Sequence, residues 1–138
     1  MLELERRRVA TEKTLARYRG KAFDWRRGIT CVHLARHHLR NMGRKVPTLP
    51  RVRSALGAKK ALKANDWASV TAMLDELLAR ITPAQMLLGD LAVVPGDQGL
   101  DAIFVCAGPQ KIFGWREDVE GMALLDVTLD ELTAAWRV

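Results

Sequence analysis

The residues best suited to chemistry lie between two glycines, Gly28 and Gly43. We expect a helix that begins at Cys31, because Thr30 is a good N-cap and Gly43 is a good residue to end a helix. Helical spacing puts positions 31, 34, 35, 38, 39 and 42 on one apolar face. A thiol at the positive end of a helix dipole is in a position where its pKa falls and its thiolate becomes a usable nucleophile. On these residues alone a buried structural cysteine is the favoured interpretation, and Cys31 as a candidate nucleophile is the alternative.

A thiol nucleophile needs a base within hydrogen-bond reach, and the three histidines all follow Cys31 on the same predicted helix. His33 points away from the thiol, and His38 lies nearly two turns further on, about 10 Å along the axis. His33 and His37 are spaced i, i+4 and could hold a metal, but no third ligand is near in the sequence. We expect a polar outer face for that pair, no metal and no cofactor, and a hydrogen-bonded histidine at the edge of the core for His38.

The composition predicts one globular domain. The chain has 138 residues, 49% of them hydrophobic and 28% charged, and no apolar run approaches the length of a membrane span. The N-terminus alternates charge and lacks the apolar centre of a secretion signal. Cys31 and Cys106 are far apart and outside any metal-ligand spacing, so we expect free thiols in a protein made in the cytoplasm without a signal peptide.

The chain is basic, with a net charge of +6. The segment from Arg44 to Lys63 holds seven basic residues and no acid, at positions 44, 45, 51, 53, 59, 60 and 63. Such a stretch can bind nucleic acid, form a solvated face, or provide one side of a protein interface. No aromatic residue interleaves with these charges to stack on bases, so nucleic-acid binding is the less favoured of these possibilities.

The N-terminal half is predicted to be helical. The first helix has a thin apolar face, which suggests that it lies across the surface or packs against a partner. In the connection after it, Phe23 and Trp25 are large anchors that would pin the start of the Cys31 helix. Pro47 and Pro50 predict an extended crossing. The expected segments are helix 3–19, connection 20–30, helix 31–42, extended 44–52, helix 53–64, and a helix capped by Asn65 or Asp66 that runs to Ile81.

The C-terminal half has the pattern of short strands joined by tight turns, which favours an antiparallel sheet. The expected strands are Leu91–Val94, Ala102–Ala107, Lys111–Trp115 and Met122–Val127, with turn chemistry at residues 95–99. Thr128 is expected to cap a short closing helix, Leu129–Trp136. The fold class is therefore α+β, with N-terminal helices packed on a C-terminal antiparallel sheet. We divide the chain into an N-terminal helix, 1–19, and a single α+β domain, 20–138.

The order of three blocks resembles the NlpC-type, papain-like superfamily of cell-wall peptidases, and in particular its small phage-encoded branch from tail-tip gene clusters. These blocks are the aromatic-containing lead-in to Cys31 (Phe23 to Leu34), the segment Gly89-Asp90-Leu91-Ala92-Val93-Val94, and the glycine-ended strand Ile103 to Gly108. The closing Ala-Ala-Trp-Arg-Val is also similar to the end of the phage branch. The likeness runs from residue 20 to the last residue and implies an NlpC-like fold for that part of the chain.

The resemblance also implies roles for particular residues. In that superfamily the cysteine is the nucleophile, a histidine at the start of the following strand is its base, and a polar residue on the next strand orients the histidine. Cys31 matches the cysteine, although Thr30 replaces the acid that commonly precedes it. The histidine position falls at Asp101 or Ala102, and no histidine follows residue 38. Gln110 is placed near the orienting position, where it has nothing to orient.

We therefore expect a catalytically degenerate member of this superfamily, a structural component of the tail tip or baseplate of a phage or phage-like particle. Its partners would be other tail or baseplate proteins, and its location the tail of the virion. The main alternative is an active cysteine amidase or endopeptidase that cleaves peptidoglycan peptides, with Cys31 as nucleophile and a base from elsewhere. A further alternative is a basic nucleic-acid-associated module that uses Arg44 to Lys63.

Overall fold

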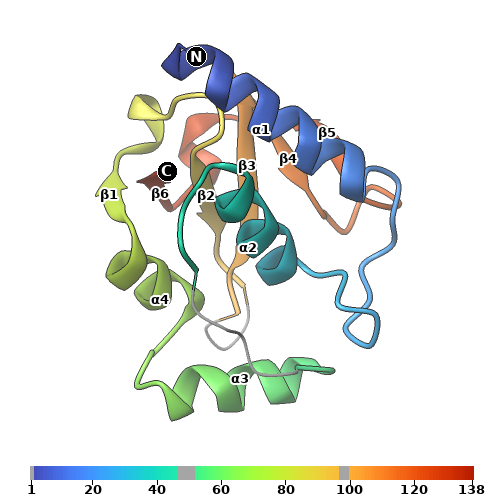
Figure 1. Ribbon diagram of the computed structural model, residues 1–138. Helices are drawn as coiled ribbons and strands as arrows, with labels where there is room; N and C mark the ends of the chain where they lie inside the picture. The colour runs from blue at the N-terminus through green and yellow to red at the C-terminus, as the bar shows by residue number, and fades with distance from the viewer. Residues whose placement is uncertain (1, 47–51, 97–99) are drawn as a thin grey trace.

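The computed structural model describes residues 2–46, 52–96 and 100–138. In this part of the chain, helices cover one face of an antiparallel sheet (Figure 1). The helices are α1 (Glu3–Tyr18), α2 (Cys31–Asn41), α3 (Ala55–Ala64) and α4 (Val70–Leu77), with 3₁₀ turns η1 (Pro83–Gln85) and η3 (Leu129–Glu131). The strands are β1 (Ala79–Ile81), β2 (Leu91–Val94), β3 (Ala102–Gly108), β4 (Lys111–Gly114), β5 (Ala123–Asp126) and β6 (Ala134–Arg137). The expected α+β class, with helices packed on an antiparallel sheet, is confirmed.

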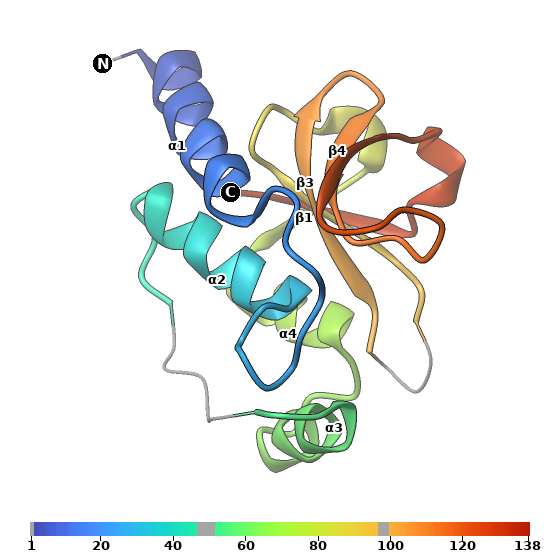
Figure 2. The ribbon, with the colours of Figure 1, turned by 90° about the vertical axis from the view of Figure 1, so that its right-hand side faces the viewer.

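The described strands pair in the order β1-β6-β2-β3-β4-β5, and every pair is antiparallel. Because successive strand residues point to opposite faces, the sheet separates two hydrophobic clusters. The larger cluster lies between the sheet and the helices and includes Leu34 of α2, Ile103 of β3 and Trp136 of β6. The smaller one lies on the other face, around Phe104 and Leu132. Figure 2 shows α1 and α2 side by side against the helix-covered face.

Helix α2 is the element that the sequence specifies best. It begins at Cys31, and the Thr30 hydroxyl accepts a hydrogen bond from the backbone N–H of His33, as an N-cap does. Its buried residues are Leu34, Ala35, His38 and Leu39, all from the predicted apolar face. It packs on both α1 and β3, so the start of β3 and the start of α2 are held together.

Helix α1 is attached through buried polar groups instead of a broad apolar face. The guanidinium of Arg7, a residue only 4% exposed, donates to the Asp90 carboxylate at 3.0 Å and to the backbone oxygens of Leu88 and Val138 at 2.9 and 2.6 Å. Its Nε also donates to Glu3 at 3.0 Å. These bonds connect the first helix to the start of β2 and the end of β6, since every polar group of a buried arginine must find a partner.

The predicted closing helix, Leu129–Trp136, is wrong beyond its first turn. Only Leu129–Glu131 forms a 3₁₀ turn, and Ala134–Arg137 is strand β6, between β1 and β2. The apolar spacing that suggested a helix also fits a strand that is buried on both faces. Here the pairing with two neighbouring strands and the burial of Trp136 decide the conformation, and tertiary packing overrides the local pattern.

The long helix predicted up to Ile81 is also wrong at both ends. Asn65 is the C-cap of α3 and Asp66 has a positive φ of 59°, so both residues end a helix instead of starting one. α4 is capped by Ser69, whose hydroxyl accepts from the N–H of Ala72, and Ile81 belongs to β1. The extended crossing predicted at 44–52 and the turn at 95–99 fall partly on 47–51 and 97–99, which lie outside the described residues.

None of the helices formed by residues 2–46, 52–96 and 100–138 combines the length and hydropathy that a membrane-spanning helix needs.

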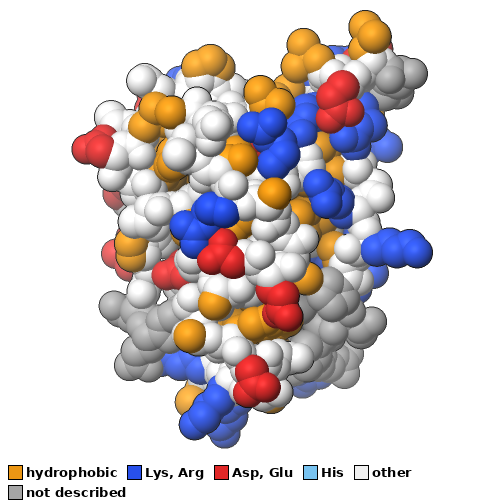
Figure 3. All heavy atoms as spheres, turned by 90° about the vertical axis from the view of Figure 1, so that its left-hand side faces the viewer, with side chains coloured by type: hydrophobic (Ala, Val, Ile, Leu, Met, Phe, Trp, Pro, Cys, Tyr) orange, Lys and Arg blue, Asp and Glu red, His pale blue; other side chains and the backbone are white. Residues whose placement is uncertain are grey.

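The face of the molecule that carries α4 and β1 has acidic and basic side chains interspersed (Figure 3). Charge on that face is therefore mixed.

We predict that Arg7→Met lowers the free energy of unfolding by about 3 to 5 kcal/mol, because it leaves the Asp90 carboxylate buried with fewer partners. Urea denaturation followed by circular dichroism measures the change. The matched control is Arg8→Met, which removes an exposed pair with Glu12 and is expected to cost less than about 1 kcal/mol. Equal losses for the two variants would contradict the role given to Arg7.

Candidate functional site

Cys31 is the first residue of α2 and packs against the main core while remaining partly exposed. Its sulfur lies 4.0 Å from the backbone oxygen of Asp101, the residue before β3. The sulfur therefore faces the start of β3, the part of the sheet where the resemblance places the base. Of the two residues that could occupy that position, Asp101 shares its strand face with Ile103, which belongs to the helix-side cluster, whereas Ala102 belongs to the opposite cluster.

The Asp101 carboxylate is committed to α4 and to the turn before β3. One oxygen accepts from the Thr71 backbone N–H at 3.1 Å and from the Thr71 hydroxyl at 2.7 Å. The other accepts from the N–H of Gly96 at 3.3 Å. The carboxylate thus caps the first turn of α4, where helix N–H groups lack partners of their own. It holds neighbouring elements together and does not bond the thiol.

The pKa of the Cys31 thiol is raised, not lowered. Burial of the sulfur is the main cause of this rise, although the residue as a whole is partly exposed. A backbone hydrogen bond from Ile103 lowers the pKa, and the negative charge of Asp101 raises it further. The helix position alone predicts a lowered pKa, and that expectation is wrong because desolvation of the thiolate outweighs the helix dipole. A thiol with a raised pKa holds little thiolate at neutral pH.

The hydrogen bonds and ring contacts of the α2 histidines go to groups other than the Cys31 thiol. His33 Nδ1 forms a 2.7 Å hydrogen bond with the Thr30 hydroxyl, and its ring lies over Gly28, whose φ of +69° favours glycine. His37 packs edge-on against the Tyr18 ring, with 5.8 Å between centroids. Burial lowers the pKa of both histidines. In the part of the chain that the structure describes, no group of three or more His, Cys, Asp or Glu is placed to hold a metal ion.

His38 is fully buried, deeper than the core edge where the sequence places it. Its Nε2 lies 2.7 Å from the carbonyl oxygen of Gly89, and its Nδ1 lies 2.8 Å from the Thr14 hydroxyl. A carbonyl only accepts, so Nε2 carries the proton, and in the neutral ring Nδ1 accepts from Thr14. Desolvation lowers the pKa of His38 to about 4. The imidazole is therefore a neutral connector between α1, α2 and the segment before β2.

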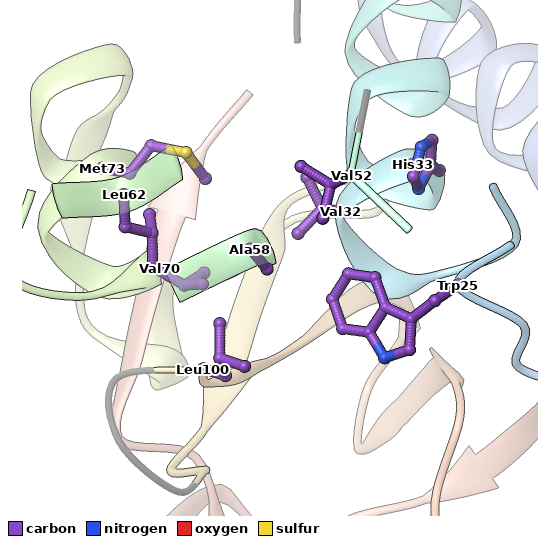
Figure 4. A pocket seen from close by; sticks show the side chains of 9 residues that line it. All are labelled: Trp25, Val32, His33, Val52, Ala58, Leu62, Val70, Met73 and Leu100. Atoms are coloured by element: carbon purple, nitrogen blue, oxygen red, sulfur yellow. The ribbon is translucent and has the colours of Figure 1, made fainter. Parts of the chain in front are cut away.

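A small apolar cleft lies beside Cys31 and Asp101, between their chain neighbours Val32 and Leu100. Its volume is about 50 Å³, and Figure 4 shows side chains from α3 and α4 facing side chains from α2 and the connection before it. His33 is its one titratable lining residue among the described ones. The lining consists of Trp25, Val32, His33, Val52, Ala58, Leu62, Val70, Met73 and Leu100. Trp25, which the sequence suggests as an anchor for the start of α2, thus forms one wall of this cleft.

Comparison with solved structures gives the fold a name. The crystal structure of the NlpC/p60 domain of the peptidoglycan hydrolase SagA matches 95% of this chain and 98% of its own, with a TM-score of 0.60 and 16% sequence identity. The chain therefore has an NlpC/p60-like fold. A family model described as "Domain of unknown function (DUF6950)" matches residues 3–138. The chain belongs to the DUF6950 family. No curated protein shows significant similarity to it.

In this DUF6950 chain, the elements of an NlpC/p60-like fold bring Cys31 and Asp101 together but leave Gln110 elsewhere. Gln110 lies beyond the far end of β3, in the turn to β4, with a positive φ of 54°. At roughly 3.3 Å per strand residue, the length of β3 separates it from Asp101 by about 20 Å or more. The part that sequence reasoning missed is Thr71, and no local signal marks it, because its bond to Asp101 spans thirty residues.

The lowered pKa of His38 makes the free energy of unfolding depend on pH. Its pKa is lowered in the folded protein, so between about pH 6.5 and 4 the unfolded chain binds more protons and the folded state loses stability as the pH falls. Between pH 7.5 and 5 we expect a loss of about 2 kcal/mol from this residue. Urea denaturation across that range measures it, and His38→Gln should flatten the dependence. An equally steep decline in the variant would assign the effect to other groups.

Substitutions of Asp101 test whether a base at this position can activate the thiol of Cys31. Asp101→His removes a negative charge that raises the pKa of the thiol, and it puts an imidazole on the residue whose backbone oxygen lies 4.0 Å from the sulfur. If that imidazole reaches the sulfur, we expect iodoacetamide to alkylate Cys31 at least tenfold faster at pH 7.5, a change equivalent to about one pKa unit. Asp101→Asn is the matched control, which removes the charge without adding a base, and it should change the rate less. Peptide mass mapping separates Cys31 from the buried Cys106. Equal rates for the His and Asn variants would contradict this geometry.

Proposed function

We propose that this chain is a structural, non-enzymatic component of the tail tip or baseplate of a phage or phage-like particle, built on an NlpC/p60-like fold. The observation that carries the proposal is the identity of the residue opposite Cys31. Asp101 lies there, and its carboxylate is bonded to Thr71 and Gly96. A peptidase of this architecture needs an imidazole at that place.

The chemical reason is the proton balance of cysteine hydrolysis. The base must take a proton from a thiol of pKa near 8.5 and return it to the leaving amine, which suits an imidazole of pKa near 6.5 and not a carboxylate of pKa near 4. Here the pKa of the thiol is also raised, so proton removal is harder still. A shared fold does not imply shared chemistry, and in this chain the site favours a role without catalysis.

The assignment to a particle rests on the resemblance of the sequence blocks to the phage-encoded branch, and the surface supports a docking role. Helix α1 leaves Leu2 before it and Leu4 within it 78% and 70% exposed. Basic residues Lys60 and Lys63 are exposed on α3. Exposed aliphatic side chains and a one-sided basic helix are suited to contacts with neighbouring tail or baseplate proteins.

Two measurements test the proposal. Purified particles from a host that carries the gene should contain the chain, detected by mass spectrometry, and deletion of the gene should impair tail assembly. Purified protein incubated with peptidoglycan sacculi should release no more amine than Cys31→Ala does. Release that requires Cys31 would establish the alternative, an active cell-wall peptidase, and absence of the chain from particles would rule out the structural assignment.

A further inference from the structure

The exposed charges of this chain are unevenly distributed between its two ends, with a basic helix face at one end and an acidic sheet edge at the other. We propose that copies of the chain associate head to tail, with the outward face of α3 of one copy docked on the β5–η3 edge of the next. This contact uses no residue of the Cys31 site, so it goes beyond the proposed function and does not depend on whether the thiol is catalytic.

Helix α3 presents basic side chains and one leucine to the outside. Its buried residues, Ala58 and Leu62, lie one turn apart on the inner side. At about 100° of rotation per residue, Leu56, Lys60 and Lys63 lie on the opposite side. Leu56 is 60% exposed, and the two exposed lysines form no ion pair with any residue that the structure describes. We call these three outward residues the basic face of α3.

The β5 side of the sheet is acidic. Residues 110–131 hold six acids and two bases, although the whole chain has a net charge of +6. Leu124, 43% exposed, and Leu129, 38% exposed, belong to the same segment. Among the described strands β5 pairs only with β4, so it ends the sheet. We call the two leucines and the six exposed acids the acidic edge, and these acids are Glu117, Asp118, Glu120, Asp126, Asp130 and Glu131.

The acids of this edge are neighbours in space as well as in sequence. Arg116 donates to the Asp118 carboxylate at 3.0 Å and to the backbone oxygen of Asp126 at 3.3 Å. The pKa of Arg116 is raised, chiefly by the hydrogen bond with Asp118, and the negative charges of Glu131 and Asp126 contribute. Lys111, the other base, pairs with Asp126. Both bases are therefore held within the edge, and an excess of negative charge remains for a partner.

An open cleft at the acidic edge has room for side chains of a second copy. Its volume is about 480 Å³, and its lining includes Lys111 of β4, Asp126 of β5, and Thr128 and Glu131 around η3. Glu131 accepts from the Thr128 hydroxyl at 3.0 Å and forms no ion pair within the described part of the chain. Because a dry cavity of roughly 150 Å³ holds a benzene ring, this cleft admits more than one lysine or leucine side chain.

The two surfaces lie at opposite ends of the molecule, α3 at the lower end of both ribbon views and the segment with β5 and η3 at the upper end (Figures 1 and 2). One chain therefore cannot bring its own surfaces together, whereas a second copy can. Because the two surfaces differ, the contact is heterologous, and its repetition generates a ring or an open filament.

The match between the surfaces is both electrostatic and apolar. Lysines of the basic face oppose carboxylates of the acidic edge, while Leu56 meets Leu124 or Leu129, and such charge complementarity speeds encounter and sets the register. The net charge of +6 does not prevent this contact, because charges further apart than about 8 Å are largely screened at physiological salt. Duplex DNA would cover only the basic face and leave the acidic edge without a partner.

Sedimentation velocity of the full chain, from about 5 to 500 µM, tests the contact. In about 50 mM NaCl we expect the mean mass to rise with concentration and to pass that of a dimer. Raising NaCl to about 500 mM should lower it, because salt screens the facing charges.

Charge reversal on each surface tests the two halves separately. Lys60→Glu with Lys63→Glu, the face variant, should raise the dissociation constant at least tenfold, because two acids then face the acidic edge. Asp130→Lys with Glu131→Lys, the edge variant, should do the same. A 1:1 mixture of the two variants should associate again, because the reversed face meets the reversed edge and the unchanged surfaces also meet.

The matched control is Arg44→Glu with Lys45→Glu, an equal charge change at exposed sites of the same basic segment, just after α2 and away from α3. It should leave the dissociation constant within twofold. Urea midpoints followed by circular dichroism show that each variant is folded, and the mixture supplies a test that a loss of folding cannot imitate.

Four results would overturn the head-to-tail contact. They are a chain that stays monomeric at about 500 µM, even if it binds duplex DNA; association that stops at a dimer; equal losses for the face variant and its control; and folded face and edge variants that do not associate when mixed. Hydrolysis of peptidoglycan through Cys31 would remove the proposed function and leave this contact standing.

Discussion

The fold depends on one buried carboxylate. Asp90 is completely buried and accepts hydrogen bonds from the backbone N–H groups of Leu87 and Val138 and from the guanidinium of Arg7. Arg137 completes the set, with its Nε 2.9 Å from the carboxylate. A buried charge is tolerated only when it is paired and hydrogen-bonded, so this group requires α1, the start of β2 and the end of β6 to meet at one point.

The neighbouring residue extends that constraint to α2. Gly89 has a φ of +88°, and a side chain there would lie 3.0 Å from the hydroxyl of Thr11, so the backbone of this segment approaches α1 closely. Its carbonyl accepts from His38, which also bonds Thr14 of α1. The helix that carries Cys31 is thereby fixed against both α1 and the sheet. The position of the sulfur beside β3 follows from this polar framework as much as from hydrophobic packing.

In this NlpC/p60-like fold, Cys31 lies at the start of its helix, opposite the beginning of β3. The residue opposite is an aspartate that caps α4, and α3 and α4 supply apolar side chains to the space beside the sulfur. The cleft near Cys31 is small and apolar, and burial raises the pKa of the thiol.

Residue patterns alone determined the parts of the protein whose cause is local. The start of α2 at Cys31, its buried face, the strands from β2 to β5 and the absence of a histidine after residue 38 all follow from caps, periodicity and composition. Only the tertiary structure decided that Ala134–Arg137 is a strand, that Asp101 turns to Thr71, and that the pKa of Cys31 rises. Strand pairing, long-range hydrogen bonds and desolvation depend on residues far apart in the chain, and no local pattern records them.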